Sequence, residues 1–154
     1  MRCERLRTVQ FAGAIALAAS TAFAAACGGG SSSSNVTAPT GTVTTDTFNG
    51  TVQVGGSDSH NFTVTVAGSV SITLVSTAPQ TTLTMGLGVG TPSSTGTCSF
   101  LSGGTTLTAA GSTAQLTGTL NAGTYCVAVV DQGNIAPNPP GPGLITYTVT
   151  VAHT

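Results

Sequence analysis

The sequence has almost no positive charge. Its 154 residues contain three Lys and Arg residues in total, all of them arginines within the first seven positions. A surface without Lys or Arg cannot neutralise phosphate groups, so we exclude nucleic acid as a partner. The same absence excludes a polybasic patch that would hold the chain to anionic lipid by charge alone.

Catalytic side chains and aromatic platforms are scarce too. There is no Trp, and aromatic residues make up 5% of the chain. Catalysis needs an activated nucleophile or an acid–base pair with a suitable pKa. We therefore expect no enzyme and no cofactor, since the ionisable candidates beyond residue 7 are few: Asp46, Asp58, His60, Asp131 and His153.

The first 26 residues have the plan of a secretory signal peptide. A basic segment, MRCERLR, precedes an uncharged run ending in Ala-rich sequence. That run has roughly 16 residues, whereas a transmembrane helix needs roughly 20 apolar ones. Ala24-Ala25-Ala26 would serve as an A-x-A cleavage site.

Cys27 directly follows this run and precedes GGGSSSS. The tract resembles a bacterial lipoprotein signal, in which the Cys thiol receives a diacylglyceryl group and the signal is cut just before it. Ala24 stands where that family usually has Leu. The resemblance implies a lipid anchor on Cys27, with the membrane as partner, and two acyl chains make such an anchor stable. An ordinary secreted protein with a Cys after its cleavage site is the alternative.

The residues after Cys27 predict a tether. Residues 28–41 have almost no apolar content and cannot pack, and a flexible chain of about 14 residues reaches roughly 20 Å. Gly28 follows Cys27. The resemblance to Gram-negative lipoproteins, in which an Asp at this position marks retention in the inner membrane, implies the outer membrane if the host is Gram-negative. We therefore divide the chain into a signal peptide (1–26), a lipidated Cys with its tether (27–41) and one folded domain (42–154).

Apolar and polar residues alternate in the folded domain, which predicts β-strands. Asn49-Gly50 lies between two alternating runs and predicts a type I′ hairpin. The run at 123–131 is apolar on both faces, so we expect a central strand covered on both sides. With the hairpin, this predicts roughly eight or nine strands in an all-β fold, a single antiparallel β-sandwich with a thin aliphatic core. The other alternating segments are 60–68, 69–76, 81–90, 114–120 and 144–153.

Cys98 and Cys126 are predicted to form a disulfide. Both lie downstream of the export signal, where disulfides form. Cys3 leaves with the signal and Cys27 is acylated, so one pair remains. Closing a loop of about 29 residues would stabilise the fold by roughly 3–4 kcal/mol. A metal or redox pair is the alternative, although no C-x-x-C exists and no His adjoins either Cys.

Three segments together resemble the bacterial pre-peptidase C-terminal (PPC) domain: HNFTVTVAGSVSITL, AQLTGTLNAGTYCVAVVD and ITYTVTV. The similarity extends from near residue 58 to the end. It implies a jelly-roll-like β-sandwich with an accessory or adhesive role beside exported enzymes. The chain departs from many members in having TTLTMGLG in place of an acidic central strand, so a calcium site is not carried over. The matching positions are Phe62, Ala67-Gly68, Ala122-Gly123, Tyr125 and Tyr147.

The remaining polar motifs have structural interpretations. Asp58 and His60 precede Phe62, where Asp and Ser form turns, and no G-x-S-x-G motif accompanies them. His153 is expected to fray at the chain end. Asp131-Gln132-Gly133-Asn134 predicts a type I turn or an Asx turn rather than a calcium loop, because one carboxylate is few for Ca²⁺.

Two further segments have structural or surface roles. Residues 86–90, GLGVG, lack phosphate-loop spacing and predict a bare sheet face that permits close backbone approach or a bulge. The loop at 135–143 is a candidate site for binding a partner. Sugar stacking would depend on Phe48 or Phe100, because Tyr125 and Tyr147 fall on the expected inner faces.

The sequence thus predicts a lipid-anchored, non-enzymatic β-sandwich of the cell envelope with an accessory, adhesive or structural role. The alternative is a module that binds a glycan or calcium.

Overall fold

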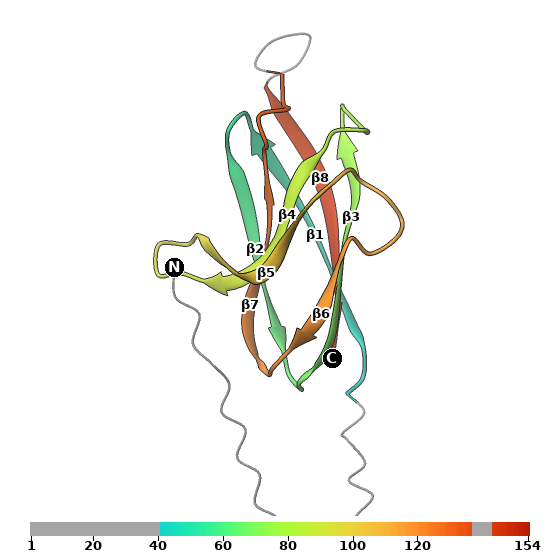
Figure 1. The fold of residues 1–154 in the computed structure, drawn as a ribbon, viewed down its shortest axis with the longest axis vertical. Helices are drawn as coiled ribbons and strands as arrows, with labels where there is room; N and C mark the ends of the chain where they lie inside the picture. The colour runs from blue at the N-terminus through green and yellow to red at the C-terminus, as the bar shows by residue number, and fades with distance from the viewer. Residues whose placement is uncertain (1–40, 137–142) are drawn as a thin grey trace, which may run out of the picture. The chain divides into compact units, whose positions relative to one another are not determined.

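The computed structural model describes residues 41–136 and 143–154. Cys27, the signal, most of the tether and most of the Pro-rich loop lie outside these ranges. The described part is all β, with eight antiparallel strands in two four-stranded sheets (Figure 1). The strands are β1 (Thr44–Gln53), β2 (Ser57–Val64), β3 (Gly68–Ala78), β4 (Met85–Pro92), β5 (Cys98–Thr108), β6 (Leu116–Leu120), β7 (Gly123–Val130) and β8 (Leu144–His153).

The strand order is that of a jelly roll. One sheet has the order β1-β8-β3-β6 and the other β2-β7-β4-β5. Most consecutive strands therefore lie in opposite sheets, as two interleaved Greek keys require. The predicted antiparallel β-sandwich is confirmed. The described residues include no helix with the length and apolarity to cross a membrane.

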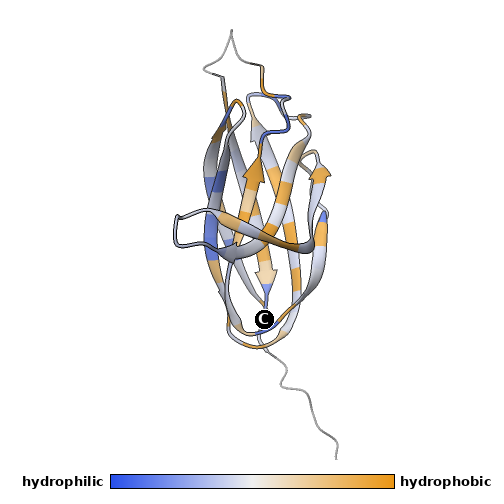
Figure 2. Ribbon diagram, turned by 60° about the vertical axis from the view of Figure 1, so that its left-hand side comes forward, coloured by the Kyte–Doolittle hydropathy of each residue, from blue (hydrophilic) through white to orange (hydrophobic). Residues whose placement is uncertain are grey.

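The core lies between the two sheets and is mostly aliphatic. Alternation brings every second side chain inward, and Figure 2 shows the apolar residues as separate bands along the strands. In β8, buried residues alternate with more exposed ones throughout the strand. Residues 126–129 of β7 are all buried, so this strand is covered on both faces, as predicted. The buried residues of β8 include Ile145, Tyr147, Val149 and Val151.

The predicted hairpin at Asn49-Gly50 is wrong. β1 runs unbroken through both residues and pairs with β8 from Thr44↔His153 to Gln53↔Leu144. Gly50 is required for close packing, because a Cβ there would overlap the Asp58 carboxylate and the Tyr147 phenol. Close packing against two other strands, rather than a turn, explains this glycine.

β5 was not among the segments predicted from alternation. Its register against β4 shifts, so that Gly88 pairs with Thr105 while Gly90 pairs with Phe100. The intervening β5 residues include Gly103, with a φ of 72°. This irregularity breaks the period of two on which the sequence pattern depends. The predicted hairpin counted β1 as two strands, whereas β5 was missed. These two errors cancel, so the eight observed strands still agree with the predicted eight or nine.

The start of β5 crosses the outer face of β4, over the glycines of the GLGVG segment (Figure 1). A Cβ at Gly88 would meet the Phe100 ring, and one at Gly90 would meet the Ser99 backbone. Of the predicted alternatives for this segment, close backbone approach or a bulge, the close approach is confirmed, and the irregularity lies in β5. Next to this crossing, the predicted disulfide joins Cys98 to Cys126 of β7, with Cα atoms 5.8 Å apart.

Candidate functional site

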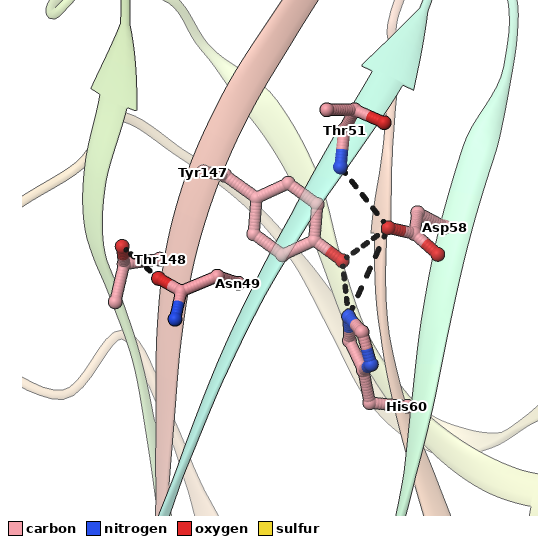
Figure 3. A network of polar contacts seen from close by, with 6 residues as sticks. All are labelled: Asn49, Thr51, Asp58, His60, Tyr147 and Thr148. Atoms are coloured by element: carbon pink, nitrogen blue, oxygen red, sulfur yellow. Dashed lines mark hydrogen bonds and ion pairs between the residues drawn. The ribbon is translucent and has the colours of Figure 1, made fainter.

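A polar cluster lies between the sheets where their edge strands β1 and β2 approach each other (Figure 3). Asp58 and His60 come from β2 and Tyr147 from β8. The prediction of a turn at Asp58 is wrong, because β2 already begins at Ser57. His60, the first residue of the predicted strand at 60–68, does lie in β2, and both side chains are half-buried. The missed signal was the phase of the alternation. Phe62 and Val64 point inward, so the same face continues back to His60 and Asp58.

Hydrogen bonds connect the three side chains. The Tyr147 hydroxyl donates to Asp58 Oδ2 over 3.1 Å, and the backbone N–H of Thr51 donates to the same oxygen over 3.1 Å. His60 Nε2 lies 3.1 Å from the Tyr147 hydroxyl and 3.8 Å from Asp58 Oδ2. Because the single phenol proton points at Asp58, Nε2 is the donor to the Tyr147 oxygen.

The surroundings keep Tyr147 protonated. Burial and the nearby Asp58 charge, together with the hydrogen bond to it, raise the pKa of the Tyr147 hydroxyl well above its usual value. A phenol in this state donates a hydrogen bond and does not act as a base near neutral pH. The Phe48 ring stacks on His60, with centroids 5.0 Å apart and planes 6° apart. The cluster is therefore suited to tying β1, β2 and β8 together across the edge of the sandwich.

His153 does not fray, contrary to expectation. It ends β8, is 5% exposed, and its Nε2 lies 3.0 Å from Asp46 Oδ2 on β1. Its ring also packs against Phe62, with centroids 5.4 Å apart. The cause is the β1–β8 pairing, which keeps the last residues of the chain in the sheet. Its Nδ1 is buried and has no hydrogen-bond partner among the described residues.

Asp131 caps the turn after β7, which confirms the predicted Asx turn. Its Oδ1 accepts hydrogen bonds from the backbone N–H groups of Gly133, Asn134 and Ile135, and its Oδ2 accepts one from Gly55 over 2.7 Å. Desolvation opposes ionisation here, but these four bonds outweigh it and lower the pKa of the Asp131 carboxyl. Among residues 41–136 and 143–154, no three His, Cys, Asp or Glu side chains come together as a metal site.

A groove lies on the outer face of the second sheet, over the β4 glycines. Its volume is about 460 Å³. Of the two aromatics considered for sugar stacking, Phe48 is packed against His60, whereas Phe100 is 45% exposed and lines this groove. The side chain of Gln132 occupies the space beside Gly86. The sequence analysis identified Phe100 and the glycines as two separate features and did not predict that they lie next to each other.

Comparison with models of known protein families and with curated proteins finds no match to this chain.

Proposed function

We propose that this protein is a lipid-anchored jelly-roll module of the bacterial cell envelope, with a non-enzymatic accessory, adhesive or structural role. The anchor is proposed from the resemblance of the sequence between Ala24 and Ser34 to a lipoprotein signal, in which Cys27 follows the expected export signal and precedes a Gly- and Ser-rich tether. Acylation would also remove the reactivity of a free thiol in an oxidising compartment. The folded domain would then act near the membrane through its surface.

One observation carries the non-enzymatic part of the proposal. Each of the three carboxylates in the described residues is engaged in holding the fold. Asp131 accepts four backbone N–H groups, Asp58 accepts from Thr51 and Tyr147, and Asp46 pairs with His153. A general base must instead face a substrate proton within hydrogen-bonding reach.

The strand order supports the resemblance to PPC domains, which implies a jelly-roll-like sandwich. The motif positions are packing positions in this chain: Phe62 and Tyr147 are buried, and Phe62 packs on Tyr125 with centroids 5.9 Å apart. A fold does not by itself specify a function. The accessory role is therefore proposed from the motif and the scarcity of free ionisable groups together.

The anchor is tested by Cys27→Ser in a bacterial host. We expect the wild-type chain to label with radioactive palmitate and to sediment with membranes, because lipidation needs the thiol. Cys27→Ser should lose the label and leave the membrane fraction. Ser31→Ala, which changes the tether four residues away, should behave as wild type. Membrane association and normal labelling of Cys27→Ser would contradict the proposal.

A separate experiment tests the non-enzymatic part of the proposal. Turnover in a broad esterase and glycosidase screen that is lost in Asp58→Asn or His60→Ala, with the fold intact, would overturn it.

A further inference from the structure

We propose that the outer face of the second sheet carries a binding groove for a neutral saccharide, with Phe100 as its stacking platform. The inference rests on the proposed role of the domain as a module that acts through its surface. It does not depend on the lipid anchor.

The floor of the groove is backbone. Gly86 and Gly88 point to the same outer face of β4, about 7 Å apart along the strand. The Gln132 amide occupies the side-chain space of Gly86, and the Phe100 ring occupies that of Gly88. A ring and an amide therefore lie next to each other on the sheet surface. A side chain at either glycine would displace Gln132 or Phe100, so the glycines are what allow these two groups to lie on the sheet surface.

The walls combine apolar and hydrogen-bonding groups. Leu107 of β5 and Val130 of β7 pair with Gly86 from opposite sides, and Thr105 pairs with Gly88. Leu107 is 65% exposed, so its apolar surface is available to a ligand. Thr105 and Gln132 supply a hydroxyl and an amide at the same surface. One apolar face with a few polar groups is the usual lining of a small-molecule site.

The backbone at Phe100 is held in position by its own pairing and by the two residues before it. Two residues before it, Cys98 is bonded to Cys126 of β7. The adjacent Ser99 backbone lies directly over Gly90, and Phe100 itself pairs with Gly90 in the β4–β5 register. An aromatic ring that is already ordered loses little conformational entropy on binding, which favours affinity at an exposed site.

Charge decides between possible ligands. None of the described residues that line the groove is charged, and Asp131, which precedes Gln132, is turned inward and bonded to backbone. A phosphate-bearing or carboxylate-bearing ligand would find no counter-ion there. A sugar ring carries no charge, presents an apolar C–H face to an aromatic ring, and has hydroxyls that suit an amide and a Thr side chain. The groove volume of about 460 Å³ lies within the range of small-ligand sites.

The test is a titration of the purified full chain with four neutral oligosaccharides: cellohexaose, maltohexaose, laminarihexaose and chitohexaose. Isothermal calorimetry should show saturable binding of at least one of them. Phe100→Ala should weaken that binding by about tenfold or more, since it removes an aromatic stacking partner. Gln132→Ala should weaken it less, and Phe100→Tyr, which keeps the ring, should retain it.

Matched controls separate binding from folding. Val75→Ala removes an exposed apolar side chain from β3 in the other sheet and should leave the affinity unchanged. Urea midpoints identify any variant whose fold is impaired, and Gln132→Ala changes an exposed residue outside the strands.

Three results would overturn the inference. They are no binding of any of the four sugars at millimolar concentration, binding that survives Phe100→Ala, and self-association that Phe100→Ala abolishes in the absence of sugar binding. None of these bears on membrane partition, so failure here is distinguishable from failure of the anchor.

Discussion

At the scale of single residues, the few ionisable side chains of the folded region hold other groups in place. Asp131 illustrates the mechanism: its carboxylate is 7% exposed and accepts four backbone N–H groups. One of these, from Gly55, comes from the β1–β2 connection, 76 residues away in sequence. The side chain thus joins two loops at one end of the sandwich. Removing it would take the acceptor from four backbone donors, and the N–H of the buried Ile135 would be left without a partner, which is costly.

We expect Asp131→Ala to lower the free energy of unfolding by about 3 kcal/mol at neutral pH, because several backbone donors lose a charged acceptor. Folding lowers the pKa of this carboxyl below its unfolded value of 3.8. Its contribution is therefore complete above that pH and is lost as the pH falls through the folded pKa. Urea titrations of wild type and Asp131→Ala at several pH values measure the difference.

The neighbouring variant Gln132→Ala provides the control, since an exposed residue should change stability by less than about 0.5 kcal/mol. A difference between wild type and Asp131→Ala that stays constant from neutral pH to below the folded pKa would contradict this account.

At the scale of elements, the β4 glycines determine how β5 is placed. Gly88 and Gly90 leave the outer face of β4 open, so the start of β5 can cross it rather than continue as a flat edge strand. The crossing covers Cys126 and Ala128 of β7, which are 1% and 3% exposed. A flat edge would instead present unpaired backbone groups to other chains. The glycines therefore explain both the bulge in β5 and the burial of β7 on its second face.

Gly90→Ala should disrupt this crossing. The added Cβ would overlap the Ser99 backbone, which cannot rotate away as a side chain can. We expect a loss of about 1–3 kcal/mol in unfolding free energy, the usual cost of overpacking. Gly118→Ala is the matched control, because that glycine lies in β6 with open space at its Cβ position.

Urea midpoints measure both variants. Equal stability of Gly90→Ala and Gly118→Ala would show that the close approach of Ser99 does not constrain the strand.

At the scale of the whole molecule, stability depends on contacts between distant parts of the chain. β1 pairs with β8 at the opposite end of the sequence, and the core between the sheets is built mainly from Val, Leu and Ile. Such pairings have a large loop-closure entropy. The bond between Cys98 and Cys126 reduces that entropy in the unfolded chain, which helps a domain with a thin core.

Replacing both cysteines, as Cys98→Ser with Cys126→Ser, should lower the unfolding free energy by roughly 3–4 kcal/mol on the chain-entropy model. Wild type treated with reductant should approach the same value, whereas the double variant should not respond to reductant. Urea unfolding with and without dithiothreitol measures both effects. Free thiols at both positions in protein isolated without reductant would contradict the assignment.

Several features were predictable from local sequence because they depend on local physics. The alternation in residues 144–153 fixes which side chains face inward, whatever the neighbouring strands are. The Asx turn at Asp131 needs only the residues that follow it. The bare face of 86–90 is visible in its glycines. The pairing of Cys98 with Cys126 was predicted because, with Cys3 assigned to an export signal and Cys27 to a lipid anchor, two cysteines remain.

Other features were not predictable, because a distant partner outweighs local preference. Asn49-Gly50 is a strong hairpin signal, yet β8 offers β1 a continuous partner and the glycine accommodates Tyr147 and Asp58. His153 is ordered by Asp46, 107 residues away in sequence. Asp58 and His60 are a different case, because the alternation through Phe62 and Val64 already places both on the inward face, and only their partner Tyr147 comes from the opposite sheet.

Composition and the period of two were enough to predict the class of fold, the inward face of most strands, the disulfide and the scarcity of free ionisable groups. Cys27 and the residues around it also predict the lipid anchor. Packing in three dimensions was needed to establish that β1 is one strand, that β5 crosses β4, and that Phe100 and Gln132 lie together over the glycines. Those outcomes depend on which strands become neighbours, and strand neighbours are selected by the packing of two complete sheets rather than by any local segment.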